Sequence, residues 1–94
     1  MQDDRFEWDD AKARANLEKH EASFDVARRV FDDPAAVDRL DDDGTHGEDR
    51  SVITGMVAGS LLTVVYTVRE EGIRIISARK ATRREQVRYF GQSI

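Results

Sequence analysis

Basic side chains that could bind phosphate gather in one stretch of the chain. Residues 73–90, IRIISARKATRREQVRYF, contain six Arg or Lys residues where an apolar strand pattern runs into a helix start. The whole chain has a net charge of −4, so general basicity does not explain this cluster. Residues 1–49 contain 7 Lys and Arg against 16 Asp and Glu, a net of −9, whereas residues 50–94 contain 8 against 3, a net of +5. A local cationic surface indicates a polyanionic partner, most often nucleic acid, although an acidic protein fits the same electrostatics.

Arginine suits phosphate chemistry because its guanidinium stays charged, binds phosphate through two parallel hydrogen bonds and stabilises a phosphorane-like transition state without accepting a proton. Arg79, at the end of a predicted strand, is the first candidate for a catalytic residue. Arg50 and Arg74 are the next candidates. If both turns of the meander are tight, each lies opposite Val68, so the two share one face of the sheet about 10 Å apart. The candidates for peripheral phosphate contacts are Arg69, Lys80, Arg83, Arg84 and Arg88. For any single Arg, a surface ion pair is the alternative.

The same register assigns the other strand residues to faces, because side chains alternate along a strand. It puts Thr67, Arg69, Ser77 and Arg79 on the face opposite Arg50 and Arg74. The more apolar face, which should meet the helices, would hold Val52, Met56, Leu62, Val64, Tyr66 and Ile76. A slip of one residue would exchange the two sets.

Proton transfer by an imidazole would need one of the two histidines, His20 or His46. His46 is the stronger candidate because it lies in an acidic loop beside Glu48, itself a possible proton acceptor. His20 ends a predicted helix, where an imidazolium would favour the helix dipole. The acidic loop matches no EF-hand or zinc spacing, so we expect no metal site and no cofactor.

Length and composition limit the class of protein. Ninety-four residues are enough for one domain and too few for two. The lack of cysteine excludes disulfides, thiolate catalysis and Cys-type zinc sites, and it fits a reducing cytoplasm. The N-terminal residues are acidic, and apolar runs are two or three residues long. We therefore expect a cytoplasmic protein with neither a signal peptide nor a membrane span.

The periodicity predicts an α+β fold with a short N-terminal strand, two helices, an antiparallel meander and a C-terminal helix. Asp9 or Asp10 would cap the first helix, which runs to about His20, and Ser23 would cap the second, which stops at Pro34. Strands are expected over residues 36–40, 51–56, 61–69 and 73–78. Thr82 and Glu85 form a capping box, and the last helix would carry Val87 and Phe90 inward.

Several segments together resemble the BrnT toxin family. They are FEWD at residues 6–9, the spacing of Lys12, Asn16, Lys19 and His20, Phe24 with FDDP at residues 31–34, the Glu48 and Arg50 pair, and RIISARKATRRE at residues 74–85. BrnT proteins are toxins of bacterial type II toxin-antitoxin pairs, so the resemblance implies one toxin domain over residues 1–94 with a fold similar to RelE-type ribonucleases. It also implies RNA cleavage that blocks translation, and inhibition by a BrnA-like antitoxin with a ribbon-helix-helix part through which the pair binds its promoter DNA.

Residue by residue, the resemblance supports six of the candidates: Arg79, Lys80, Arg74, Glu48, Arg50 and His20. The chain departs from the family pattern at Glu21, where Gly commonly follows the KH pair, so this helix end must close differently.

Three hypotheses follow. In the first, the protein is a metal-independent endoribonuclease in which the RNA 2′-hydroxyl attacks the adjacent phosphate and leaves a 2′,3′-cyclic phosphate and a 5′-hydroxyl. Arg79 with Arg50 or Arg74 would stabilise the added charge, and Glu48 or a histidine would transfer the proton. In the second, a non-catalytic module binds an acidic antitoxin segment or nucleic acid. In the third, the chain binds DNA alone through its last helix.

Overall fold

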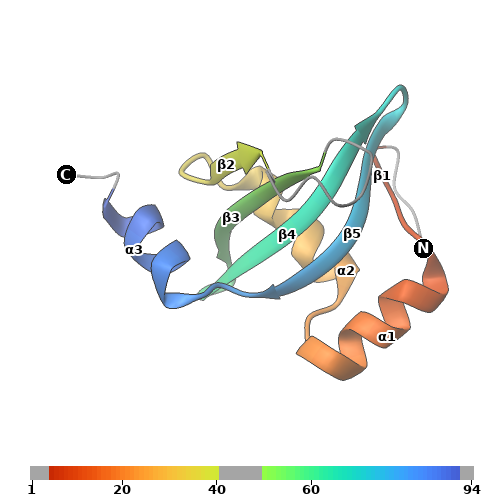
Figure 1. Cartoon of the computed structure of the whole chain (residues 1–94), viewed down its shortest axis with the longest axis horizontal. Helices are drawn as coiled ribbons and strands as arrows, with labels where there is room; N and C mark the ends of the chain where they lie inside the picture. Colours follow the sequence, from red (N-terminus) through yellow and green to blue (C-terminus); the bar gives the residue numbers. More distant parts are fainter. Residues whose placement is uncertain (1–4, 41–49, 92–94) are drawn as a thin grey trace.

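The computed structural model describes residues 5–40 and 50–91 of the chain. Its elements follow the predicted α+β order (Figure 1). They are β1 (Phe6–Glu7), α1 (Asp10–His20), α2 (Phe24–Ala27), the 3-10 helix η1 (Arg28–Asp32), β2 (Val37–Leu40), β3 (Ser51–Val57), β4 (Ser60–Arg69), β5 (Gly72–Lys80) and α3 (Arg83–Gly91). No helix in these two ranges is long and apolar enough to cross a membrane. The similarity to RelE-type ribonucleases stays a prediction.

The five strands found in the described residues form one sheet in the order β1-β5-β4-β3-β2. The pairs from β2 to β5 are antiparallel, as predicted, whereas β1 lies parallel to β5 and makes the sheet mixed. The Ile73 amide donates to the Arg5 carbonyl at 2.8 Å, just before β1. A Cβ at Gly72 would lie 2.3 Å from the same carbonyl oxygen, so this close approach needs glycine.

The helix ends form largely through local side-chain hydrogen bonds that the sequence predicts. Asp9 caps α1 by accepting from the Lys12 amide, and Ser23 caps α2 by accepting from the Val26 amide. Glu21 ends α1 in the left-handed conformation, with φ at 57°, and its amide donates to the Leu17 carbonyl. Glutamate thus adopts the backbone geometry that glycine commonly provides at helix ends.

The core lies between one face of the sheet and the helices α1, α2 and η1. Its aromatic members pack edge to face, with Trp8 against Phe24 and Phe31 against Tyr66. The helix α3 stands apart from these helices, at the end of the sheet that carries the β3–β4 turn (Figure 1). The prediction that α3 buries Val87 and Phe90 is wrong, because these side chains are 64% and 54% exposed.

The predicted strand register is also wrong by one residue over part of the sheet. The β3–β4 turn has only two residues, Ala58 and Gly59, both with positive φ, so Ser51 pairs with Tyr66. A bulge after Val65 then shifts β5 against β4, and Arg74 pairs with Thr67 rather than Val68. The core therefore takes Ile53, Val57 and Ile75 in place of Val52, Met56 and Ile76, whereas Leu62, Val64 and Tyr66 face inward as expected.

The corrected register moves Arg74 to the face that carries Thr67, Arg69, Ser77 and Arg79. Arg50 directly precedes β3, and alternation from Val52 puts it on this face too. The arginines predicted on opposite faces thus share one, which we call the arginine face. It is defined by Arg39, Arg50, Arg69, Arg74 and Arg79.

Asn16 attaches α1 to the edge of β5. Its side-chain nitrogen donates to the carbonyls of Ala22 and Ala78 at 2.9 and 2.8 Å, and its oxygen accepts from the Ala78 amide at 3.1 Å. This edge of β5 pairs with the strand β1 at Ile73, but at Ala78 its backbone groups are hydrogen-bonded by the Asn16 side chain and not by a strand. This contact fixes the end of α1 next to Arg79.

We predict that Asn16→Ala lowers the free energy of unfolding by about 2–4 kcal/mol, because it leaves three buried backbone groups without their partner. Urea denaturation measures the change. Lys12→Ala, on the exposed side of the same helix, serves as the control and should change stability by less than about 0.5 kcal/mol. A loss below about 1 kcal/mol for Asn16→Ala would contradict this role.

Candidate functional site

A buried carboxylate, that of Glu85, organises the end of the arginine face. Glu85 is the third residue of α3 and only 5% exposed. Arg79 binds it through both terminal nitrogens, at 2.7 and 3.0 Å. The Thr63 hydroxyl and the Thr82 amide donate to Oε1 at 2.9 and 2.8 Å, and Arg39 donates to Oε2 at 3.3 Å. Five hydrogen bonds therefore hold the two oxygens, in a cluster that we call the Glu85 cluster.

The protonation state of the Glu85 cluster follows from these contacts. Although burial by itself raises the pKa of the Glu85 carboxyl, the hydrogen bonds from Arg79, the Thr82 amide and Thr63 outweigh it and lower the pKa from 4.5 to about 2. The carboxylate can only accept hydrogen bonds, so the Thr63 hydroxyl donates its single proton to Glu85. Thr54, whose hydroxyl oxygen lies 2.8 Å from that of Thr63, must then donate to Thr63. Glu85 is too weak a base to accept a proton during catalysis near neutral pH.

Arg79 keeps part of its binding capacity in the Glu85 cluster. A guanidinium has five N–H groups, and three are used here, two by Glu85 and one by the Lys80 carbonyl at 3.4 Å. No residue in the ranges 5–40 and 50–91 accepts from its Nε proton or from one Nη2 proton, so both can serve a ligand, and the side chain is 32% exposed. Arg79 can therefore hold Glu85 and bind a phosphate oxygen at the same time.

A groove of about 440 Å³ joins Arg79 to the end of α1. It is lined by Glu18, Lys19, His20, Glu21, Arg79 and Lys80. Because Asn16 binds the backbone of Ala78, the last turn of α1 lies beside the end of β5. The structure thus brings together three of the predicted site residues, His20, Arg79 and Lys80, from segments about 60 residues apart in the sequence.

The remaining candidates on the arginine face lie farther along the strands. Arg74 is five residues from Arg79 on β5, about 16 Å at strand spacing, so the two cannot bind one phosphate group. An ion pair at 3.6 Å links Arg74 to Glu7. Arg69 donates to the Thr67 hydroxyl at 3.3 Å. Arg50 has a buried Nε with no hydrogen-bond partner among the described residues, which is unusual for a guanidinium.

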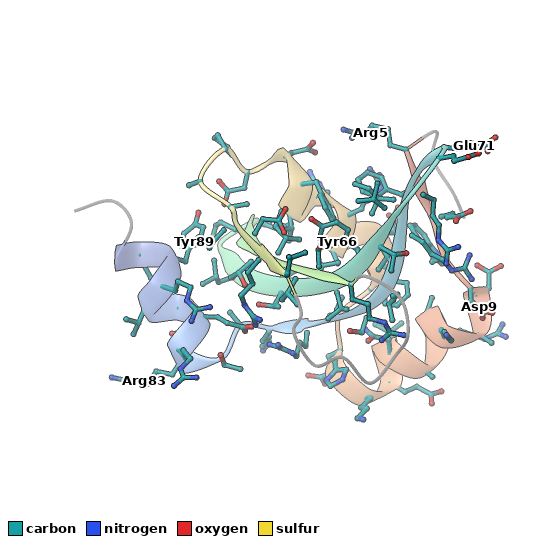
Figure 2. All side chains as sticks on the ribbon, turned by 45° about the horizontal axis from the view of Figure 1, so that its top comes forward. Arg5, Asp9, Tyr66, Glu71, Arg83 and Tyr89 are labelled. Atoms are coloured by element: carbon teal, nitrogen blue, oxygen red, sulfur yellow. The ribbon has the colours of Figure 1, made fainter. Side chains whose placement is uncertain are left out.

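The other predicted residues lie elsewhere. Arg83, Arg84 and Arg88 are exposed on α3. Figure 2 shows Arg83 pointing outward from α3, and Tyr89 on the side of this helix nearer the sheet. His46 and Glu48 lie outside the described residues. Within residues 5–40 and 50–91, no group of three or more His, Asp or Glu side chains could hold a metal ion.

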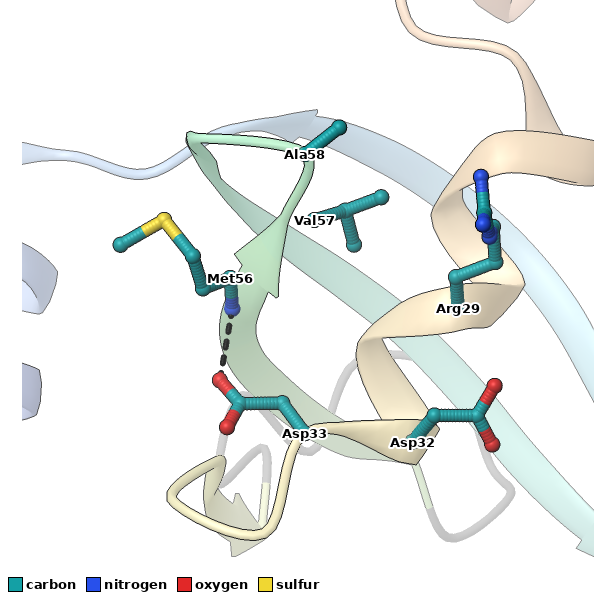
Figure 3. A pocket seen from close by; sticks show the side chains of 6 residues that line it. All are labelled: Arg29, Asp32, Asp33, Met56, Val57 and Ala58. Carbon is teal, nitrogen blue, oxygen red and sulfur yellow. Dashed lines mark hydrogen bonds between the residues drawn. The ribbon is translucent and has the colours of Figure 1, made fainter.

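Sequence reasoning missed the contacts that hold α3 in place. The Tyr89 hydroxyl and the Met56 amide both donate to Oδ2 of Asp33, at 2.6 and 2.8 Å, and these bonds lower the pKa of the Asp33 carboxyl. Figure 3 shows the Met56 bond at the wall of a second pocket, of about 280 Å³, between η1 and β3. Sequence reasoning also missed Arg39, although the alternation of side chains along β2 could have indicated that Arg39 lies on the arginine face. The signal for Glu85 was its capping box, which explains only one of its five hydrogen bonds.

We predict that Glu85→Gln destabilises the protein in a pH-dependent way. The folded-state pKa of Glu85 is depressed, so its stabilisation is complete above the unfolded value of about 4.5 and is lost as the pH falls through about 2. The shift corresponds to roughly 3 kcal/mol. Urea unfolding between pH 2 and 7 should show a wild-type advantage of about this size at pH 7 that shrinks below about pH 4.5. An advantage that does not change with pH would refute the depressed pKa.

Comparison with protein families finds one model that matches most of the chain. The family model described as the ribonuclease toxin BrnT of type II toxin-antitoxin systems matches residues 8–85, a range that ends on Glu85. A search of curated proteins returns no significant match. The matched range covers most of the chain and includes the groove, the Glu85 cluster and the strands β2 to β5, whereas β1 lies just outside it. The chain therefore belongs to the BrnT family of ribonuclease toxins of type II toxin-antitoxin systems.

Proposed function

We propose that the protein is a metal-independent endoribonuclease that blocks translation by cutting RNA, with its reaction centre in the groove between α1 and β5. The observation that carries this proposal is the meeting of His20, Arg79 and Lys80 in one groove. A proton-transfer group and two cations are what cleavage by the RNA 2′-hydroxyl needs.

In the proposed reaction, the 2′-hydroxyl attacks the adjacent phosphorus and the bond to the 5′-oxygen of the next nucleotide breaks. The products are a 2′,3′-cyclic phosphate and a 5′-hydroxyl. Arg79 binds the phosphate oxygens through its two remaining N–H groups and stabilises their added negative charge. Lys80 supplies a second positive charge, and His20 takes the proton from the 2′-hydroxyl and returns it to the leaving 5′-oxygen. The Glu85 cluster keeps the Arg79 guanidinium in one orientation, so little ordering is required when RNA binds.

The arginine face extends this centre for RNA binding. Arg74, Arg69 and Arg50 lie too far along the sheet to reach the phosphate at Arg79, and they are suited to neighbouring nucleotides. The acidic first half of the chain, at −9, would repel RNA from other surfaces and restrict binding to this face. We further propose that a BrnA-like antitoxin inhibits the enzyme and that the pair binds its own promoter DNA through the antitoxin.

A second candidate function is supported by the same cluster. Glu85 occupies three of the N–H groups on Arg79 and Arg39 that could bind phosphate. In this case the chain is a non-catalytic module that binds its antitoxin without cutting RNA. Expression of the chain alone distinguishes the two, because a ribonuclease should arrest growth and a module should be tolerated.

We predict that purified protein cleaves end-labelled RNA in EDTA, and that Arg79→Ala reduces the rate about 100-fold or more. Arg79→Lys should restore only part of the rate, because an ammonium keeps the charge but lacks the guanidinium fork. Arg14→Ala, an exposed arginine on α1 outside the groove, should retain the wild-type rate. Cleavage that requires magnesium, or products that end in a 3′-hydroxyl, would exclude the proposed reaction.

We also predict that His20→Gln and Lys80→Ala affect different kinetic constants. The loss of a proton-transfer group should lower kcat about 100-fold with little change in KM. The loss of a cation that binds substrate and transition state alike should mainly raise KM. Steady-state cleavage of a short fluorescent RNA provides both constants. An unchanged kcat in His20→Gln would assign proton transfer to another residue, such as one of the two groove carboxylates, Glu18 and Glu21.

A further inference from the structure

The outward side of α3 combines exposed apolar surface with positive charge. Val87 is 64% exposed and Phe90 is 54% exposed, although the Phe90 ring contacts Tyr89. Arg83, Arg84 and Arg88 surround them, and none of the three makes an ion pair with another described residue. The inward side of the helix is already occupied, by Glu85 in its cluster and by Tyr89 on Asp33.

The positions of these arginines indicate what kind of partner the surface fits. Arg83 and Arg84 lie in the first turn of α3, where the helix dipole is positive and a cation is unfavourable. The one acidic side chain of that turn, Glu85, is turned inward to Arg79 and Arg39. Positive charge therefore accumulates at this end of the helix, and an anionic partner would relieve it.

The apolar side chains distinguish between a protein partner and RNA. A phosphate backbone offers no apolar surface to cover Val87, whereas a protein segment can bury it while its carboxylates pair with the arginines. The groove of the proposed reaction centre is lined by the end of α1 and the end of β5, and among the described residues none of those that line it belongs to α3. The α3 surface is therefore not needed to hold RNA in the groove.

We propose that the outward side of α3 is the docking surface for an acidic, partly apolar segment of the antitoxin. The identity of this partner rests on the proposed toxin-antitoxin function, whereas its chemistry rests on α3 alone. Apolar contact with Val87 and Phe90 would supply affinity, and the arginines would select a segment with negative charge.

The test is a matched pair of substitutions at one position, Val87→Glu and Val87→Lys. Both remove the apolar contact and add a long charged side chain at an exposed site, so thermal unfolding should not change. Binding of the antitoxin encoded with this chain, measured by calorimetry, should weaken about tenfold or more in Val87→Glu and clearly less in Val87→Lys. Leu17→Glu makes the same change at a 48% exposed apolar position on α1 and should bind like wild type.

RNA cleavage by each variant without antitoxin separates this proposal from the proposed function. Wild-type cleavage rates together with weakened antitoxin binding in Val87→Glu support the docking surface. Weakened cleavage with intact antitoxin binding would overturn it and assign the surface to RNA. The docking surface would also be overturned if Val87→Glu and Val87→Lys bound the antitoxin equally well, or if Leu17→Glu weakened antitoxin binding as much as Val87→Glu does. Self-association of the wild type that Val87→Glu abolishes would overturn it too. If the wild type cuts no RNA, the ribonuclease proposal fails and the binding comparison still applies.

Discussion

The buried charge of Glu85 is the interaction on which the rest of this structure depends. A carboxylate removed from water is strongly unfavourable unless hydrogen bonds replace its hydration. Here the replacements come from β4 through Thr63, from β5 through Arg79, from β2 through Arg39 and from the start of α3 through the Thr82 amide. One side chain thus joins three strands and a helix. The same bonds that satisfy Glu85 also orient the arginine that we propose for catalysis.

The parts of the fold that could be predicted are those that neighbouring residues determine. The caps at Asp9 and Ser23 and the capping box of Thr82 and Glu85 depend on side chains within three residues of the amides they bind. Strand periodicity likewise located the meander. The family resemblance depends on short motifs of the same kind and drew attention to Arg79, Lys80 and His20, which the structure brings into one groove.

The parts that could not be predicted depend on contacts across the chain. Register follows from turn length and from a bulge, and neither a two-residue turn that starts at alanine nor the shift after Val65 has a clear sequence signal. The expected burial of Val87 and Phe90 assumed that a helix docks through apolar side chains. The helix α3 docks instead through a carboxylate and a phenol, so its apolar residues are left outside. Asn16 carried no signal for its contact with a strand 62 residues away.

The contact between Asn16 and Ala78 has a consequence for the order of events during synthesis. Contacts with large sequence separation form late, because the intervening chain must be made and ordered first. The first helix can form early from its own caps, but its attachment to the sheet must wait until Ala78 has left the ribosome. The groove, with its wall at Arg79, and the Glu85 cluster are completed later still. A ribosome translating this chain therefore carries no complete Glu85 cluster until residue 85 emerges, and a nascent chain that stalls earlier lacks the contacts that orient Arg79.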